Sequence, residues 1–103
     1  MAQFDVYINN NKSAKDFPYL LDVQTDLLDD LNTRLVIPLI NSAKEKNPIK
    51  NLNFVFEIEG KRMLMSTAEM AGVPNRSLGK KVTSLKNYRD KIIAAIDFLI
   101  TGL

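Results

Sequence analysis

The sequence contains no cysteine and no histidine, and it has only four glycines. Without cysteine there is no disulfide framework and no thiolate nucleophile, and without histidine the usual general base and the commonest metal ligand are missing. No glycine-rich phosphate loop and no metal-ligand cluster is evident from residue spacing. We therefore expect no metal and no cofactor, and we predict that function depends on a surface rather than on a catalytic pocket.

The sequence also has little net charge and no long apolar run. The net charge of +2 is too small to indicate nucleic-acid binding, and the basic residues between Arg76 and Lys91 are interrupted by acids, as on a solvated surface. The longest apolar run, Leu35 to Ile40, is far shorter than the roughly 20 residues that span a bilayer. The chain starts without a signal peptide pattern. We expect a single domain, residues 1–103, that is soluble and cytoplasmic, with no direct nucleic-acid binding and no membrane association.

Short strands dominate the hydrophobic pattern. Alternating or β-branched runs predict strands at 4–8, 19–24, 34–40, 54–58 and 61–65, with one more short strand near 78–82. Glu59-Gly60 joins two of these runs as a hairpin, and Pro38 favours an edge position or a bulge for the run that contains it. These features predict a mainly β fold, with a bent antiparallel sheet or small barrel of five or more strands capped by a C-terminal helix.

The C-terminal helix is expected over residues 86–103. One apolar stripe runs along it and is expected to face the core: Leu85, Tyr88, Ile92, Ile96, Leu99 and Leu103. Asn87 is the expected N-cap, with Asp90 three residues later. The opposite face is mixed in character and comprises Asn87, Asp90, Ala94, Asp97, Phe98 and Thr101. Because Phe98 would expose an aromatic ring there, we expect a second subunit or another partner to cover this face, unless Phe98 packs on a neighbouring loop.

Two further features leave alternatives open. Leu27, Leu28 and Leu31 lie in a polar connection, where they either fold back on the core, the commoner outcome, or form an exposed contact patch. A metal-independent ribonuclease needs only a carboxylate base and an arginine that stabilises the phosphorane. Arg34, Arg62, Asp22 and Asp26 could supply such a set, although structural or surface roles for these residues are far commoner.

Several segments together resemble the CcdB toxin family. The central ones are Asp22-Val23-Gln24-Thr25-Asp26-Leu27-Leu28-Asp29 and Arg34-Leu35-Val36-Ile37-Pro38-Leu39. Three more agree in position: Gln3-Phe4-Asp5-Val6-Tyr7, Met70-Ala71-Gly72-Val73-Pro74 and Ile96-Asp97-Phe98-Leu99-Ile100-Thr101-Gly102-Leu103. The resemblance covers almost the whole chain, and it is weakest at 41–53 and 76–86.

The resemblance implies a homodimeric toxin of a type II toxin-antitoxin module, with an SH3-like barrel shared with the MazF and Kid ribonucleases. It also implies that the protein is not an enzyme. Instead, the protein would poison DNA gyrase by binding the gyrase A protein while gyrase holds cut DNA. A CcdA-like antitoxin would neutralise it. The implied gyrase-binding residues are Leu27, Leu28, Asp90, Ala94, Asp97, Thr101, Gly102 and Leu103. The implied antitoxin-binding residues are Asp22, Val23, Thr25 and Asp26, and the implied dimer interface includes Phe98 and Leu99.

The chain departs from the family pattern at Thr101, where the best-known pattern has a tryptophan that stacks on a gyrase arginine. We expect the carboxylates of Asp90 and Asp97, together with the terminal carboxylate, to replace that stacking by charge-assisted hydrogen bonds to the same cationic partner. Two other interpretations remain: an endoribonuclease on the same fold, and a family member that dimerises and binds antitoxin without poisoning gyrase.

Overall fold

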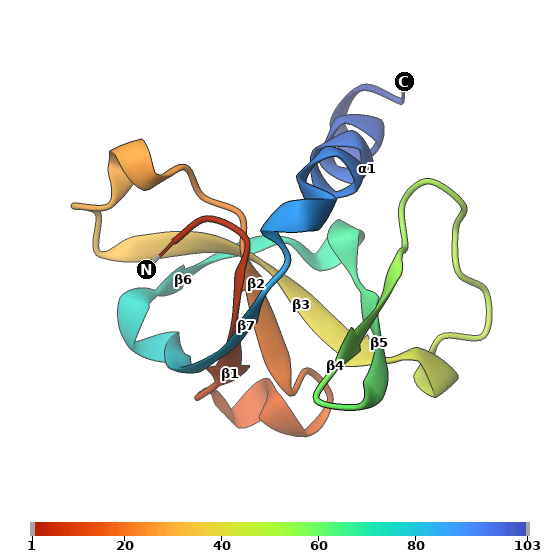
Figure 1. The fold of residues 1–103 in the computed structure, drawn as a ribbon, viewed down its shortest axis with the longest axis horizontal. Coiled ribbons are helices and arrows are strands. Elements are labelled where there is room, and N and C mark those ends of the chain that lie inside the picture. The colour runs from red at the N-terminus through yellow and green to blue at the C-terminus, as the bar shows by residue number, and fades with distance from the viewer. Residues whose placement is uncertain (1, 103) are drawn as a thin grey trace.

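The computed structural model describes residues 2–102, which form a curled seven-stranded antiparallel sheet and a C-terminal helix (Figure 1). The strands are β1 (Asp5–Asn9), β2 (Tyr19–Asp22), β3 (Thr33–Asn41), β4 (Val55–Ile58), β5 (Lys61–Met65), β6 (Ala71–Pro74) and β7 (Leu78–Ser84), and the helix is α1 (Arg89–Thr101). Short 3-10 turns occur at Lys12–Lys15, Asp26–Leu28, Ser42–Lys44, Thr67–Glu69, Asn75–Ser77 and Lys86–Tyr88. The predicted mainly β fold with a C-terminal helix is confirmed. None of the helical segments in residues 2–102 is long and apolar enough to cross a membrane.

The sheet order is β4-β5-β3-β2-β1-β7, and β6 pairs with β3 beside β5. The expected edge position of the Pro38 strand is therefore wrong, because β3 has neighbours on both sides. Pro38 is tolerated because β6 pairs only as far as Val36 and β5 begins to pair at Leu39. The Pro38 carbonyl accepts from the Ser66 N–H at 2.9 Å, so the nitrogen of Pro38 faces the same side of the strand. No ladder partner among the described residues lies opposite Pro38 on that side, so the N–H that proline lacks is not required there.

The β4–β5 hairpin is built as the sequence predicts. Ile58 pairs with Lys61, so Glu59 and Gly60 form a two-residue loop. Both have positive φ, 51° and 77°, which is the backbone that matches the twist of a tight hairpin.

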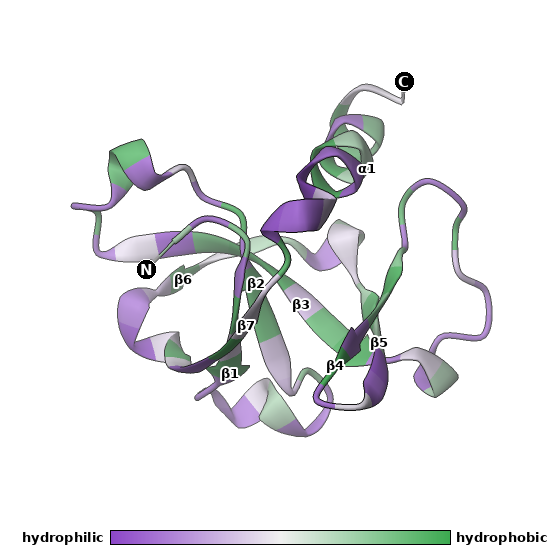
Figure 2. Cartoon of the chain, in the orientation of Figure 1, coloured by the Kyte–Doolittle hydropathy of each residue, from purple (hydrophilic) through white to green (hydrophobic). Residues whose placement is uncertain are grey.

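Neighbouring apolar residues along the central strands β1, β2 and β3 are buried on opposite faces of the sheet. Val6, Leu21 and Ile37 are fully buried beneath α1 in the larger core cluster. The residues that alternate with them belong to a second buried cluster, which contains Tyr7, Leu20, Val36 and Leu78. Figure 2 shows hydrophobic colour along much of the central strands and hydrophilic colour at the start of the helix. Burial on both sides explains why the strand sequences read as continuous apolar runs.

The helix differs from the prediction in its start and in its buried face. It begins at Arg89, and Asn87 lies in the preceding 3-10 turn without a capping hydrogen bond from its side chain to this helix. Its buried residues are Ile92 and Ala95, whereas Leu99 is 38% exposed and Phe98 is only partly exposed. The predicted core stripe is thus wrong at Tyr88, which is 46% exposed, and at Leu99, and its last residue, Leu103, lies outside the described residues. Only the first half of α1 lies over the core, because the helix then projects past the sheet (Figure 1).

Gly79 lies where β7 meets β1, and we expect Gly79→Ala to destabilise the fold. A Cβ atom there would lie 2.7 Å from Asn10 Oδ1 and 2.9 Å from the Ile8 carbonyl oxygen, so the backbone of β1 would have to shift. Overpacking of this kind costs about 1 to 3 kcal/mol, or roughly 4 to 8 °C of melting temperature per kcal/mol in a small domain. Gly72→Ala is the matched control, because nothing lies within 4 Å of the added atom. Equal melting temperatures for the two variants would contradict this packing.

Tyr19 connects β2 to the β4–β5 hairpin, and its contacts lead us to expect that the protein loses stability at high pH. Its hydroxyl donates to Glu59 Oε1 at 2.5 Å and accepts from Lys61 Nζ at 3.4 Å. Burial, followed by the hydrogen bond to Glu59, raises the Tyr19 pKa above its ordinary value of 10.0. The folded state therefore holds this proton more tightly than the unfolded chain. This stabilisation is complete below pH 10 and is lost as pH rises through the folded-state pKa.

The measurement is urea unfolding at a series of alkaline pH values. Tyr19→Phe should make the fall in unfolding free energy above about pH 10 shallower. It should not remove the fall, because burial also raises the pKa of Tyr7. An identical pH profile for Tyr19→Phe and the parent would show that Tyr19 does not contribute.

Candidate functional site

The most exposed apolar side chain among the described residues lies in the connection between β2 and β3. Leu27 is 92% exposed, and Leu28 and Leu31 are 49% and 47% exposed. We call residues 25–32 the leucine turn; it projects from the sheet in the orange part of Figure 1. Thr25 caps its 3-10 segment by accepting from the Leu27 N–H at 3.3 Å. Of the two alternatives for these leucines, the exposed patch is therefore the one observed.

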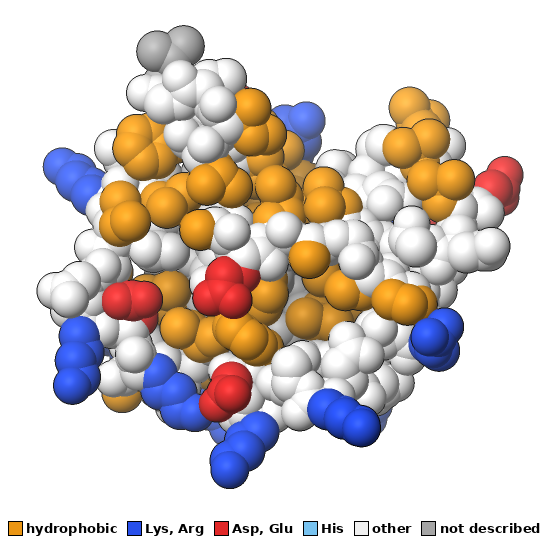
Figure 3. Space-filling model, turned by 180° about the vertical axis from the view of Figure 1, so that it is seen from behind, with side chains coloured by type: hydrophobic (Ala, Val, Ile, Leu, Met, Phe, Trp, Pro, Cys, Tyr) orange, Lys and Arg blue, Asp and Glu red, His pale blue; other side chains and the backbone are white. Residues whose placement is uncertain are grey.

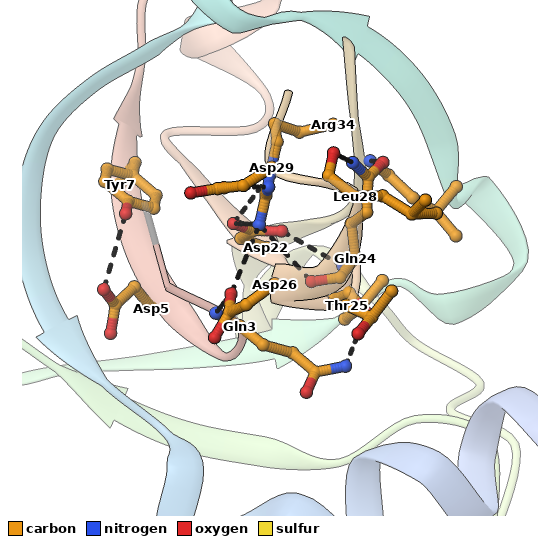
Figure 4. Close-up of polar contacts among 12 residues, drawn as sticks. Gln3, Asp5, Tyr7, Asp22, Gln24, Thr25, Asp26, Leu28, Asp29 and Arg34 are labelled. Atoms are coloured by element: carbon orange, nitrogen blue, oxygen red, sulfur yellow. Dashed lines mark hydrogen bonds and ion pairs between the residues drawn. The ribbon is translucent and has the colours of Figure 1, made fainter. Parts of the chain in front are cut away.

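A buried arginine lies directly beneath this turn. Arg34 of β3 is fully buried, and its guanidinium donates to Asp22 Oδ2 from Nε at 3.0 Å and from Nη2 at 2.6 Å. Its Nη1 donates to Asp29 Oδ1 at 2.6 Å, and Asp26 Oδ1 lies 3.8 Å from Nη2. Figure 4 shows the three carboxylates around the guanidinium. One cation thus joins the end of β2 to both ends of the exposed 3-10 segment.

The electrostatics of this cluster favour the charged arginine. Burial by itself would lower the Arg34 pKa, but the hydrogen bond and charge of Asp22, followed by the charges of Asp29 and Asp26, raise it above its ordinary value. A fully buried guanidinium is tolerated only where carboxylates surround it in this way. The side chains of Arg34 and Asp22 therefore form a buried ion pair and are not accessible to a ligand.

Two glutamines complete the attachment of the turn. The Gln24 side-chain amide donates to the Leu28 and Thr33 carbonyls at 3.1 and 3.2 Å, and its oxygen accepts from the Leu35 N–H at 3.1 Å. The Gln3 N–H donates to Asp26 Oδ1 at 2.8 Å. The sequence pattern could not reveal this network, because it joins residues from separate segments through single polar side chains.

The outer face of α1 is the second part of the implied gyrase surface. Asp90, Ala94, Asp97 and Thr101 are all exposed, as the spacing predicts for one helix face. Thr101 Oγ1 donates to the Asp97 carbonyl at 2.7 Å. Gly102 is exposed and ends the helix with a φ of 74°. Leu103 lies outside the described residues.

The residues implied for antitoxin binding are divided by burial. Asp22 and Val23 are buried, at 0% and 6% exposure, so their side chains are not at the surface. Thr25 is half-buried and Asp26 is exposed, and both belong to the leucine turn. The only side-chain surface that this set offers is therefore the start of that turn.

The four residues considered for ribonuclease chemistry are only partly brought together, because Arg34, Asp22 and Asp26 are clustered and Arg62 is not. Arg34 pairs with Val73 of β6 near the start of β3, whereas Arg62 is exposed and pairs with Glu57 in the β4–β5 ladder. Asp22 and Arg34 are buried, and only Asp26 remains beside them. This set does not form a site.

Sequence reasoning missed a polar cleft of about 430 Å³ beside the start of β1 and the end of β7. It is lined by Ala2, Gln3, Asp5, Lys81, Ser84, Lys86 and Asn87. Asp5 is 5% exposed; its Oδ2 lies 3.4 Å from Lys81 Nζ and accepts from the Tyr7 hydroxyl at 3.4 Å. The alternating pattern of β1 gave no sign that Asp5 would be buried, because the neighbouring β7 that covers it is distant in sequence.

Solved structures share this fold, among them a toxin and two endoribonucleases. The chain is similar to the Mycobacterium tuberculosis toxin MazF-mt6, with 13% identity, a TM-score of 0.75, and coverage of 93% of this chain and 95% of that one. An endoribonuclease from a mycobacterial species gives 12% identity, a TM-score of 0.75, and coverage of 100% and 92%. A mycobacterial endoribonuclease in complex with its cognate antitoxin gives 11% identity, a TM-score of 0.78, and coverage of 100% and 96%.

These likenesses correct one expectation. The expectation that the protein is not an enzyme is contradicted, because two of these structures are described as endoribonucleases and have the same fold over nearly the same length. At this level of identity the likeness shows the fold alone.

The sequence match is more specific than the structural likeness. The family model described as CcdB protein matches residues 3–102, which include both the leucine turn and α1. The chain therefore belongs to the CcdB family of toxins from toxin-antitoxin systems.

Proposed function

We propose that this toxin binds the gyrase A protein, one of the two components of DNA gyrase, and traps the complex of gyrase with cleaved DNA. The observation that carries the proposal is the 92% exposure of Leu27 on a turn held by a buried arginine. A large apolar side chain fixed in water costs free energy unless a partner covers it, so such a turn is typical of a protein-binding surface. The family resemblance supplies the identity of the partner.

The chemistry of the remaining surface is consistent with a cationic partner. Asp90 and Asp97 lie on the exposed face of α1. Asp97 is also close to the C-terminus of the helix, which is the negative end of its dipole. Carboxylates in these positions can accept charge-assisted hydrogen bonds from arginine or lysine. They offer an alternative to the aromatic stacking that Thr101 cannot provide.

We further propose that a second copy and an antitoxin cover other parts of the surface. Ile100 is 69% exposed and Leu99 38% exposed at the end of α1, and Figure 3 shows hydrophobic side chains gathered along the helix and beneath it. A homodimer would remove this area from water. A CcdA-like antitoxin is supported by the similar endoribonuclease that was solved with its cognate antitoxin. The exposed Asp26, beside Leu27, is the expected point of contact.

The test is a gyrase cleavage assay with untagged protein. Supercoiled plasmid, ATP and gyrase are incubated with the toxin, and linear DNA is measured after denaturation with detergent. Accumulation of linear DNA is the expected result, and it should not occur when gyrase is omitted. Absence of linear DNA with gyrases from several bacteria, including the source species, would refute the gyrase assignment.

A second candidate function, metal-independent RNA cleavage, is favoured by the cleft around Asp5. A buried carboxylate could remove the proton of a 2′-hydroxyl, and the ammonium groups of Lys81 and Lys86 could stabilise the phosphorane. The fold shared with endoribonucleases adds to this possibility. RNA incubated with the protein and a metal chelator should then be cleaved, and Asp5→Asn should abolish the cleavage. Intact RNA with the unmodified protein would exclude this candidate.

A further inference from the structure

The leucine turn is held in place by polar contacts rather than by apolar packing. Its three leucines are between 47% and 92% exposed, so their side chains do not anchor it in the core. Backbone hydrogen bonds within the turn are few and long: the N–H groups of Leu28, Asp29 and Leu31 donate at 3.1 to 3.2 Å to carbonyls three residues earlier. A segment with these features would ordinarily open locally at little cost in free energy.

Arg34 supplies a buried anchor for the 3-10 segment of the turn, whereas Asn75 holds the end of the turn by donating to the Leu31 and Asn32 carbonyls at 3.1 and 3.0 Å. Its guanidinium is held by Asp22, which is fully buried, and from there it reaches Asp29 at 2.6 Å just after the 3-10 segment and Asp26 at 3.8 Å at the segment's first residue. Gln24 holds the same segment from the other side through the Leu28 carbonyl. The 3-10 segment that carries Leu27 and Leu28 is thus attached at both ends to a group that cannot move without unpairing a buried charge.

We propose that Arg34, acting through Asp29 and together with Gln24, is a positioning device that holds Leu27 and Leu28 ready for their protein partner. The inference rests on the proposed gyrase function. Ordering a loop and its side chains during association weakens binding, and a turn already fixed in the bound conformation avoids that loss. Neither Arg34 nor Gln24 needs to touch the partner for this effect.

The first test measures the turn itself in the intact protein by amide hydrogen exchange. Asp29→Ala removes the tether at an exposed position, since its side chain is 51% exposed. We expect the amides of Leu28, Asp29 and Leu31 to exchange at least about tenfold faster, while amides of β3 and β5 are unchanged. Asp30→Ala is the matched control, because Asp30 is also exposed, has the same charge and lies outside the Arg34 network. Unchanged exchange at the turn in Asp29→Ala would overturn the inference.

The second test measures affinity for the gyrase A protein by titration. Asp29→Ala and Gln24→Met should each weaken binding about tenfold, through loss of the two separate tethers, and Asp30→Ala should not. The effect of Asp29→Ala should disappear when Leu27 and Leu28 are both alanine, because a tether that acts through the leucines has nothing left to position. A persistent effect in that background would overturn the inference by showing that Asp29 contacts the partner directly.

The two tests separate the inference from the function on which it rests. If the unmodified protein does not bind the gyrase A protein but Asp29→Ala still accelerates exchange at the turn, the gyrase proposal fails and the Arg34 tether stands. If binding occurs and loosening the turn does not weaken it, the positioning role fails and the gyrase proposal stands. Gln24→Met keeps the test decisive should Asp29→Ala impair folding.

Discussion

Replacing Arg34 with methionine is expected to lower the free energy of unfolding by about 3 to 5 kcal/mol. Arg34 and Asp22 are both fully buried and are joined by two hydrogen bonds to one carboxylate oxygen. Methionine fills similar space but leaves Asp22 as a buried carboxylate without its cation. The expected loss is a large part of the total stability of a small domain, which is about 5 to 15 kcal/mol.

Urea unfolding followed by circular dichroism measures this effect. Two further variants show whether the effect comes from the unpaired buried charge. Arg62→Met removes an exposed arginine from β5 and should change stability by less than about 0.5 kcal/mol. The double variant Arg34→Met with Asp22→Leu should recover much of the loss, because it removes the buried charge as well as its partner. The account would be wrong if Arg34→Met and Arg62→Met unfolded at the same urea concentration.

The largest functional effect is expected from Leu27→Asp, which should weaken binding to the gyrase A protein by at least about 30-fold. Central apolar residues of protein interfaces commonly contribute about 2 kcal/mol or more, and burying an unpaired carboxylate in the same place adds a further loss. Because Leu27 is 92% exposed in the toxin, the melting temperature should stay the same. The fall should therefore appear in affinity and in linear DNA, not in folding.

Ile49→Asp is the control for this prediction. Ile49 is 53% exposed in the connection between β3 and β4, away from the leucine turn, so an acid there tests for a general effect of added charge. Gyrase binding and cleavage should be unaffected. Equal loss of activity in the two variants would mean that the leucine turn is not a specific contact surface.

Some elements could be predicted from sequence because their determinants are local. The β4–β5 hairpin follows from two β-forming runs and the two-residue connection Glu59-Gly60. The exposed face of α1 follows from helical spacing, which placed Asp90 and Asp97 on one side. In both cases the residues that decide the structure are within a few positions of each other.

Other elements could not be predicted because residues from distant segments decide them. Pro38 indicated an edge strand, but it lies in the middle of the sheet, where β5 and β6 leave a break opposite it. The exposure of Leu99 depends on where α1 leaves the core, which periodicity alone does not specify. The cleft at Asp5 exists only because β7 pairs with β1.

Local patterns and residue order are enough to assign the strand-rich class, the hairpin, the C-terminal helix and the family. The exposure of Leu27 and Leu28, and the burial of Arg34 among Asp22, Asp26 and Asp29, arise only in the folded protein. The reason is physical: hydrophobic periodicity records which side of an element is apolar, whereas the burial of a charge depends on partners brought together by the folded sheet.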